Sequence, residues 1–107
     1  MQIKISRIAE NNIKEIFDYI VPNSLKYAEK TVRDIRSHIR NLKEFPYIGR
    51  YVPERRDKPY RELIYKNYRI IYSVYEKKEE ILIHFVIHTS RDFKKIFNSY
   101  IKNLFNF

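Results

Sequence analysis

The stretch YRELIYKNYRIIYSVYE, residues 60–76, adopts a period of two on either side of Lys66-Asn67. Apolar and polar side chains that alternate in this way are typical of β-strands. Asn tolerates the left-handed backbone conformation that a two-residue hairpin turn requires, so we expect Asn67 to allow the turn. We therefore predict two antiparallel strands, residues 60–65 and 68–76, joined by Lys66-Asn67.

This turn fixes the register of the predicted hairpin and divides its side chains between two faces, because Tyr65 then opposes Tyr68. One face holds Leu63 and Ile70, and the other holds Glu62, Ile64, Arg69 and Ile71. Glu62 lies diagonally across from Arg69, within reach of its guanidinium. Two interpretations stay open for Arg69. It forms an ordinary structural ion pair with Glu62, or it joins Arg91 in a cationic patch on the concave face that holds phosphate or carboxylate.

Residues 81–88 are rich in β-branched side chains, which predicts a central third strand. His84 and His88 have the same parity on this strand, so we expect both on one face near Arg91. A histidine that titrates near neutrality could act as a general base or acid on an RNA 2′-hydroxyl. Packed or hydrogen-bonded histidines are the commoner alternative. A histidine pair without a third ligand is a poor zinc site, so we expect no metal.

The N-terminal half predicts a short strand and two helices. Residues 2–5 alternate as a strand does, and Ile13, Ile16, Phe17 and Ile20 follow at helical spacing. We expect this helix to stop near Val21, because Pro22 disfavours the helical conformation of the residue before it. Asn23 or Ser24 can then cap a second, antiparallel helix. The apolar stripe of that helix is Ala28, Val32, Ile35, Ile39 and Leu42.

The remaining segments complete a predicted α+β fold. Residues 45–59 mix proline, glycine and charge without a period, which indicates an ordered loop. Apolar residues recur at helical spacing over residues 93–105, which predicts a last amphipathic helix. The expected order is βααβββα: an N-terminal helical hairpin packed on a small, mainly antiparallel sheet, with a C-terminal helix. We expect a single domain over residues 1–107, because this length gives room for one core.

The composition limits the classes of partner. With 22 Lys and Arg against 13 Asp and Glu, the net charge is +9. Such a charge favours an acidic partner and leaves nucleic acid, an acidic protein and a membrane surface open. The absence of cysteine excludes a disulfide framework, a thiolate metal site and a thiol nucleophile. No apolar run approaches the roughly 20 residues of a membrane span, so we expect a cytoplasmic protein without a cofactor.

Tyrosine is abundant in the predicted hairpin, where aromatic rings could stack on bases. Strands favour tyrosine in any case, so packing accounts for most of these residues. The basic face of the second helix likewise has a plain explanation as a solvated helix surface. Neither feature by itself indicates nucleic-acid binding.

The chain resembles the RelE/ParE superfamily of bacterial type II toxin-antitoxin toxins, over nearly all of its length. The segments that carry the resemblance, in the family's order and spacing, are Phe45-Pro46 with Ile48-Gly49-Arg50, Val52-Pro53-Glu54, Tyr60-Arg61-Glu62-Leu63, Tyr68-Arg69-Ile70-Ile71-Tyr72 and Ile87-His88-Thr89-Ser90-Arg91-Asp92. The resemblance implies a βααβββα fold and growth-arresting activity. It also implies neutralisation by a small antitoxin, encoded nearby, whose C-terminal segment wraps the toxin.

Two branches of this superfamily differ in their targets, since RelE-like toxins cut mRNA on the ribosome and ParE-like toxins poison DNA gyrase. RelE-like enzymes are similar to this chain at Arg69 and Arg91. However, they carry a lysine at the position of Glu62 and a catalytic tyrosine at that of Phe97. Glu62 would repel the scissile phosphate, and Phe97 has no hydroxyl for proton transfer. The resemblance therefore favours the ParE-like branch, a gyrase inhibitor without enzymatic activity of its own.

Two alternatives stay open. In a RelE-like mRNA endonuclease, Arg69 and Arg91 would hold the phosphate and His88 would be the base. The supporting residues would be Arg61, Glu62 and His84. A non-toxic basic binding module with the same fold is the other alternative, because fold does not fix function. For either toxin, the antitoxin is expected at an open edge strand or in the groove between the first two helices.

Overall fold

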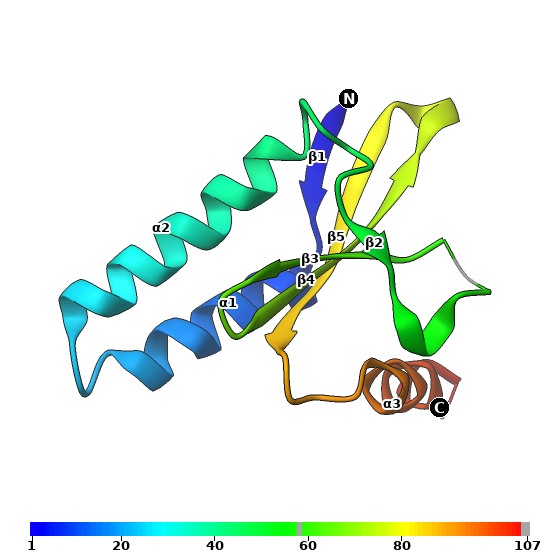
Figure 1. The fold of residues 1–107 in the computed structure, drawn as a ribbon. Helices are drawn as coiled ribbons and strands as arrows, with labels where there is room; N and C mark the ends of the chain where they lie inside the picture. The colour runs from blue at the N-terminus through cyan, green and yellow to red at the C-terminus, as the bar shows by residue number, and fades with distance from the viewer. Residues whose placement is uncertain (58, 106–107) are drawn as a thin grey trace.

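The computed structural model describes residues 1–57 and 59–105, and it confirms the α+β class (Figure 1). The elements are β1 (Gln2–Ile5), α1 (Arg7–Ile20), α2 (Leu25–Asn41), β2 (Arg50–Tyr51), β3 (Arg61–Tyr65), β4 (Tyr68–Tyr75), β5 (Glu80–His88) and α3 (Phe93–Phe105). Two 3₁₀ helices, η1 (Pro53–Arg55) and η2 (Glu76–Lys78), follow β2 and β4. The sheet has the order β1-β5-β4-β3-β2. The β1–β5 pair is parallel and the other pairs are antiparallel, as a mainly antiparallel sheet requires.

The short strand β2 was not predicted, because residues 45–59 were expected to form a loop. Arg50 pairs with Glu62 and Tyr51 pairs with Arg61, so β2 adds an outer edge to β3. Two residues are too few to show a period of two, which explains why the sequence pattern missed this strand. The edge is nevertheless important, because it carries Arg50 to the carboxylate of Glu62.

Serine side chains cap both helices of the hairpin. Ser6 Oγ accepts a hydrogen bond from Ala9 N–H, and Ser24 Oγ accepts one from Tyr27 N–H, each at 3.0 Å. Each bond satisfies an N–H group that the first helical turn leaves without a partner. The prediction of a cap at this position of α2 is therefore confirmed, and α1 ends at Ile20 as expected. Across the described residues, no helix is long and apolar enough to span a membrane.

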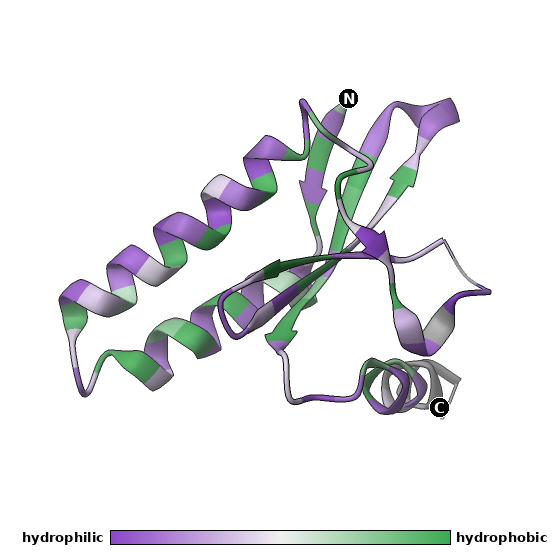
Figure 2. Ribbon diagram, viewed as in Figure 1, coloured by the Kyte–Doolittle hydropathy of each residue, from purple (hydrophilic) through white to green (hydrophobic). Residues whose placement is uncertain are grey.

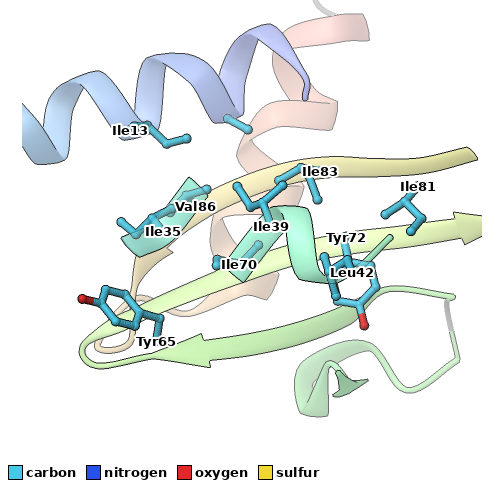
Figure 3. Packing of buried hydrophobic residues seen from close by; sticks show 11 residues of the cluster. Ile13, Ile35, Ile39, Leu42, Tyr65, Ile70, Tyr72, Ile81, Ile83 and Val86 are labelled. Atoms are coloured by element: carbon cyan, nitrogen blue, oxygen red, sulfur yellow. The ribbon is translucent and has the colours of Figure 1, made fainter. Parts of the chain in front are cut away.

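The two faces of the sheet carry separate hydrophobic clusters. The helical hairpin covers one face, and Figure 2 shows hydrophilic and hydrophobic residues alternating along α2. The buried residues of this larger cluster, shown in Figure 3, are Ala9, Ile13, Ile35, Ile39, Leu42, Tyr65, Ile70, Tyr72, Ile81, Ile83 and Val86. The buried residues of the smaller cluster, to which α3 contributes, are Val52, Ile71, Phe85, Ile87 and Phe93. Burial of each large apolar side chain contributes about 1.5–3 kcal/mol.

The β3–β4 hairpin has the predicted register but a different turn conformation. Tyr65 pairs with Tyr68, and Ile64 pairs with Arg69, as the turn at Lys66-Asn67 requires. The left-handed residue of the turn is Lys66, with φ of 50°, whereas we expected Asn67 to provide this conformation. A two-residue turn can take its positive φ at the first position alone, so the hairpin closes without glycine.

Gly49 lies where the chain leading into β2 meets β3 and β4. Its N–H donates to the hydroxyl of Tyr72 at 2.9 Å. A Cβ atom at this position would lie 2.6 Å from both the Glu62 carbonyl oxygen and the Tyr72 hydroxyl. Glycine is therefore required for the close approach of these backbone segments.

A β-bulge in β5 corrects the predicted placement of the two histidines. Ile71 pairs with Phe85 but the next residue, Tyr72, pairs with Ile83, which leaves His84 as the extra residue of β5. An extra residue reverses the parity of the strand beyond it. The expectation that His84 and His88 share a face was wrong for this reason.

Candidate functional site

Arg69 of β4 is enclosed by carboxylates and is only 6% exposed. Its Nε donates to Glu62 Oε2 at 2.7 Å, and Nη1 and Nη2 donate to the two oxygens of Glu54, each at 2.8 Å. Nη1 also donates to the backbone carbonyl of Arg91 at 3.0 Å. All three guanidinium nitrogens therefore have protein partners. The structural ion pair between Arg69 and Glu62 is confirmed.

Glu62 of β3 is shared between two arginines. It is 2% exposed, and its Oε1 accepts a hydrogen bond from Arg50 Nε at 2.7 Å while Oε2 accepts from Arg69. The Arg50 side chain is 68% exposed, so it covers the carboxylate from the solvent side. A buried carboxylate is tolerated when it is paired and hydrogen-bonded, and both oxygens of Glu62 meet this condition.

Glu54 of η1 links Arg69 to the start of α3. Its Oε2 also accepts a hydrogen bond from Phe93 N–H at 3.0 Å. The hydrogen bonds from Arg69 lower the pKa of Glu54 to about 2 against the opposing effect of burial, and the Phe93 N–H contributes in the same direction. Sequence analysis gave Glu54 no role, because its partners come from a different strand and helix and no local spacing connects them.

His84 lies on the α3 side of the sheet. Its Nε2 is 2.8 Å from Ser73 Oγ, and its ring meets that of Tyr60 edge-on, with centroids 5.2 Å apart. Burial lowers the pKa of His84 to about 4, so the ring is neutral at pH 7. In the part of the chain that the structure describes, no three His, Asp or Glu side chains are arranged to hold a metal ion.

His88 and Arg91 line one pocket of about 450 Å³ between α1 and the end of β5. Tyr68 also lines it, and its ring centroid is 6.0 Å from that of His88. The backbone N–H of Ser90 donates to His88 Nδ1 at 3.1 Å, and Ser90 Oγ is 2.8 Å from the same nitrogen. Because Nδ1 accepts, the neutral ring carries its proton on Nε2.

The predicted patch of Arg69 and Arg91 is not assembled from their side chains. Arg69 lines a hollow that it shares with Glu54 and Glu62, whereas the pocket of Arg91 lies against α1. The contact between the two residues runs from the Arg69 guanidinium to the Arg91 carbonyl. Among the described hollows, the expected site residues thus divide into two pairs, with Arg69 and Glu62 in one hollow and His88 and Arg91 in another.

Arg61 of β3 is held at the outer edge of the sheet. Its Nη1 donates to the Gly49 carbonyl at 2.8 Å, and its guanidinium carbon lies 5.1 Å and 4.3 Å from the ring centroids of Tyr47 and Tyr51. Cation–π contacts of this kind favour a fixed orientation of the rings and the cation. These described contacts of Arg61 therefore involve neither His88 nor Arg91.

Comparisons with known proteins agree with this fold. The chain is similar to a structure of the chromosomal ParDE toxin-antitoxin system from P. aeruginosa, with 24% identity, a TM-score of 0.67, and coverage of 82% of this chain and 95% of that chain. It is also similar to the toxin-antitoxin complex RelBE2 from Mycobacterium tuberculosis, with 15% identity, a TM-score of 0.54, and coverage of 81% and 95%. At these identities the likeness concerns the fold alone. No curated protein matches the chain.

The fold is that of the RelE/ParE superfamily of toxins. A family model described as the ParE toxin of the type II toxin-antitoxin system, parDE, matches residues 3–93. The chain therefore belongs to the ParE toxin family of type II toxin-antitoxin systems.

Proposed function

We propose that this ParE-family toxin arrests growth by poisoning DNA gyrase. The observation that carries the proposal is the enclosure of Arg69, the residue that a nuclease mechanism would need to hold the scissile phosphate. Arg69 is 6% exposed and donates to Glu54 and Glu62. A phosphate could replace these carboxylates only by taking Arg69 from Oε2 of the buried Glu62, which would keep Arg50 on Oε1 alone. Breaking such a buried pair costs about 3–5 kcal/mol.

Two further contacts support a toxin that does not cut RNA. Phe97 packs in an aromatic cluster with Tyr60 and Phe93, at centroid distances of 5.4 and 5.7 Å. It offers no hydroxyl for proton transfer. His84 is neutral at pH 7 and packs against Tyr60, away from the pocket of His88. A gyrase poison needs a binding surface instead of reacting groups, and it needs no cofactor.

A cognate antitoxin encoded nearby is the proposed second partner. The sheet ends in β1 on one side and in the short β2 on the other, so each outer edge offers backbone groups for strand addition. The groove between α1 and α2 is the other expected docking site, for an amphipathic helix. The net charge of +9 favours an acidic antitoxin. Co-purification should recover a small acidic protein from the adjacent reading frame, and its absence would contradict this part of the proposal.

An mRNA endonuclease is the second candidate, and the shared pocket of His88 and Arg91 favours it. Arg91 is exposed and could contact a phosphate there. However, Ser90 N–H donates to His88 Nδ1, so the neutral ring carries its proton on Nε2. In that state His88 could donate a proton but could not accept one through Nε2, as a base acting on a 2′-hydroxyl must.

Induction of the protein in a bacterial host tests the proposed function. We expect growth arrest, broken chromosomal DNA on pulsed-field gels and unchanged mRNA 5′ ends by primer extension in the same culture. Co-expression of the antitoxin should restore growth. New 5′ ends inside codons would overturn the gyrase proposal in favour of the nuclease. Unimpaired growth at every expression level would instead support a non-toxic binding module.

A further inference from the structure

Three partly exposed tyrosines each have a cation against the ring. Tyr47 is 46% exposed, Tyr51 is 53% exposed and Tyr75 is 38% exposed. Arg61 lies over the rings of Tyr47 and Tyr51, and Lys78 Nζ lies 5.9 Å from the ring centroid of Tyr75. We refer to these five residues as the tyrosine row. Large exposed aromatic side chains in such an arrangement are unusual on a surface that has no partner.

Contacts within the fold connect these residues around the edge of the sheet, where Tyr51 is in register with Tyr72 and Tyr75 lies at a position of opposite parity on β4. Arg61 lies against both Tyr47 and Tyr51 and donates to the backbone carbonyl of Gly49, so this half of the row is fixed to the sheet edge. Tyr47, Tyr75 and Lys78 line a common open hollow of about 490 Å³. The row therefore runs from β2, across this hollow, to the end of β4 and the start of the next turn.

The charges around the row favour an anionic partner. Lys77 and Lys78 line the hollow between Tyr47 and Tyr75, and Arg61 lies against Tyr47 and Tyr51. The carboxylate that lines the same hollow belongs to Glu76, and it accepts a hydrogen bond from the Tyr47 hydroxyl. Glu62, which also lies near this edge, is buried and paired. Cations thus predominate among the side chains that this surface presents to a ligand.

We propose that the tyrosine row binds single-stranded nucleic acid. Bases would stack on the exposed faces of Tyr47, Tyr51 and Tyr75, while phosphates would contact Lys78 and the neighbouring cations. Single-strand binding surfaces combine these two elements, a basic track for the backbone and aromatic rings for successive bases. Each of the three tyrosines is more than one third exposed, which leaves ring surface for a base.

An acidic polypeptide is the main competing ligand, and the arrangement favours it less. Acidic side chains would use the cations but would leave the exposed tyrosine rings without stacking partners. Duplex nucleic acid would likewise offer phosphates without free base faces. The inference goes beyond gyrase poisoning and does not depend on it, because the row contains none of Arg69, His88 and Arg91. It includes Arg61, which the nuclease alternative named only as a supporting residue.

Fluorescence anisotropy with fluorescein-labelled dT20 and rU20 tests the inference. The variants Tyr51→Ala and Tyr75→Ala are compared with Tyr19→Ala, which removes a tyrosine that is 82% exposed on α1 and lies outside the row. We expect each row variant to bind about tenfold more weakly and Tyr19→Ala to be unchanged. Circular dichroism of each variant verifies that the fold is retained. A salt series then compares Lys78→Ala with Lys26→Ala, an exposed position on α2.

Stacking and charge make separable predictions in this experiment. Lys78→Ala should reduce the slope of log affinity against log salt by about 0.7, whereas Tyr51→Ala should leave the slope unchanged. If the row variants and their controls lost the same amount of affinity for the oligonucleotide, the proposal would be overturned. The net charge of the protein alone would then explain binding. Displacement of the oligonucleotide by poly-glutamate at equal charge would also overturn it and would indicate an acidic polypeptide. Low salt strengthens contacts between cations and phosphates, so binding is also measured at about 50 mM salt. The absence of binding under this condition would overturn the proposal as well.

Discussion

At the scale of single residues, paired charges decide which side chains are available for function. Glu62 is buried between Arg50 and Arg69, and Glu54 holds the other side of the Arg69 guanidinium. Arg69 is thereby committed to the fold, although its residue type suits phosphate binding. The sequence already indicated the pair of Arg69 and Glu62 through the hairpin register. It could not indicate Glu54, which reaches Arg69 from a segment without a periodic pattern.

Removal of Arg69 should destabilise the fold far more than removal of Arg50. We expect Arg69→Ala to lower the free energy of unfolding by about 3–5 kcal/mol, because Glu62 and Glu54 lose their shared partner in a buried setting. Arg50→Ala should cost about 1 kcal/mol or less, because its side chain is 68% exposed. Urea denaturation of both variants measures the difference. Similar small losses for the two would contradict a structural role for Arg69.

Substitution of Gly49 should be costly although it adds a single methyl group. In Gly49→Ala the new Cβ would lie 2.6 Å from the Glu62 carbonyl oxygen and from the Tyr72 hydroxyl. The strands must move apart or the N–H···O bond to Tyr72 must lengthen, and we expect a loss of about 1–3 kcal/mol. Thermal unfolding followed by circular dichroism is the measurement. An unchanged midpoint of thermal unfolding would show that the backbone at Gly49 lies less close to Glu62 and Tyr72 than described.

His84 should make stability depend on pH in the acidic range. Burial lowers its pKa from 6.5 to about 4. Between these values the unfolded chain binds a proton here that the folded protein does not, so the free energy of unfolding decreases as pH falls from 6.5 to 4. His84→Gln keeps an amide near Ser73 but cannot titrate. Urea denaturation at several pH values should therefore show a shallower decrease for the variant, and parallel curves would contradict the assignment.

At the scale of elements, local patterns predicted most of the fold and long-range contacts determined the rest. The period of two in residues 2–5, the helical spacing of residues 13–20, the cap at Asn23 or Ser24 and the apolar stripe of α2 correctly predicted β1 and the helical hairpin. The missed β2 is too short for any period. The bulge at His84 depends on how β5 pairs with β4, and the positive φ of Lys66 depends on closure of the hairpin. These features arise from pairing between segments, which one sequence does not display.

The attachment of α3 should depend on Glu54. Its carboxylate accepts the Phe93 N–H at the start of α3 while it binds Arg69. We expect Glu54→Gln to speed hydrogen exchange of α3 amides and to lower the free energy of unfolding by about 1–3 kcal/mol, allowing for solvent screening of this partly exposed group. Exchange in the α1–α2 hairpin serves as the internal control. Equal acceleration in the hairpin would indicate global destabilisation instead of release of α3.

The same carboxylate sets a pH window for this attachment. The pKa of Glu54 is lowered from 4.5 to about 2, so its contribution to stability is complete above pH 4.5 and is lost as pH falls toward 2. Exchange of α3 amides in the wild-type protein should therefore rise, relative to that of the helical hairpin, below pH 4.5. In Glu54→Gln this relative rise should be absent.

At the scale of the whole molecule, the α1–α2 hairpin covers one face of the sheet and α3 lies on the other side (Figure 1). The paired Arg69 belongs to the side of α3, because Glu54 links it to Phe93 at the start of that helix. The protein has a net charge of +9, but the buried Arg69 is already paired with the carboxylates of Glu54 and Glu62. Binding of an acidic or nucleic-acid-bound partner at exposed cations is consistent with this distribution. A role for Arg69 in RNA cleavage is not consistent with it, because each guanidinium nitrogen of Arg69 already donates to a carboxylate in the described contacts.

Cleavage of supercoiled plasmid by purified DNA gyrase, with and without the purified protein, tests the central claim most directly. The reaction is stopped with detergent and protease so that trapped enzyme–DNA complexes appear as linear DNA. Our account predicts linear DNA that depends on both gyrase and the toxin, is unchanged by His88→Gln, and disappears when the antitoxin is added. Plasmid that remains intact at saturating toxin, together with ribosome-dependent cuts in a reporter mRNA, would contradict it.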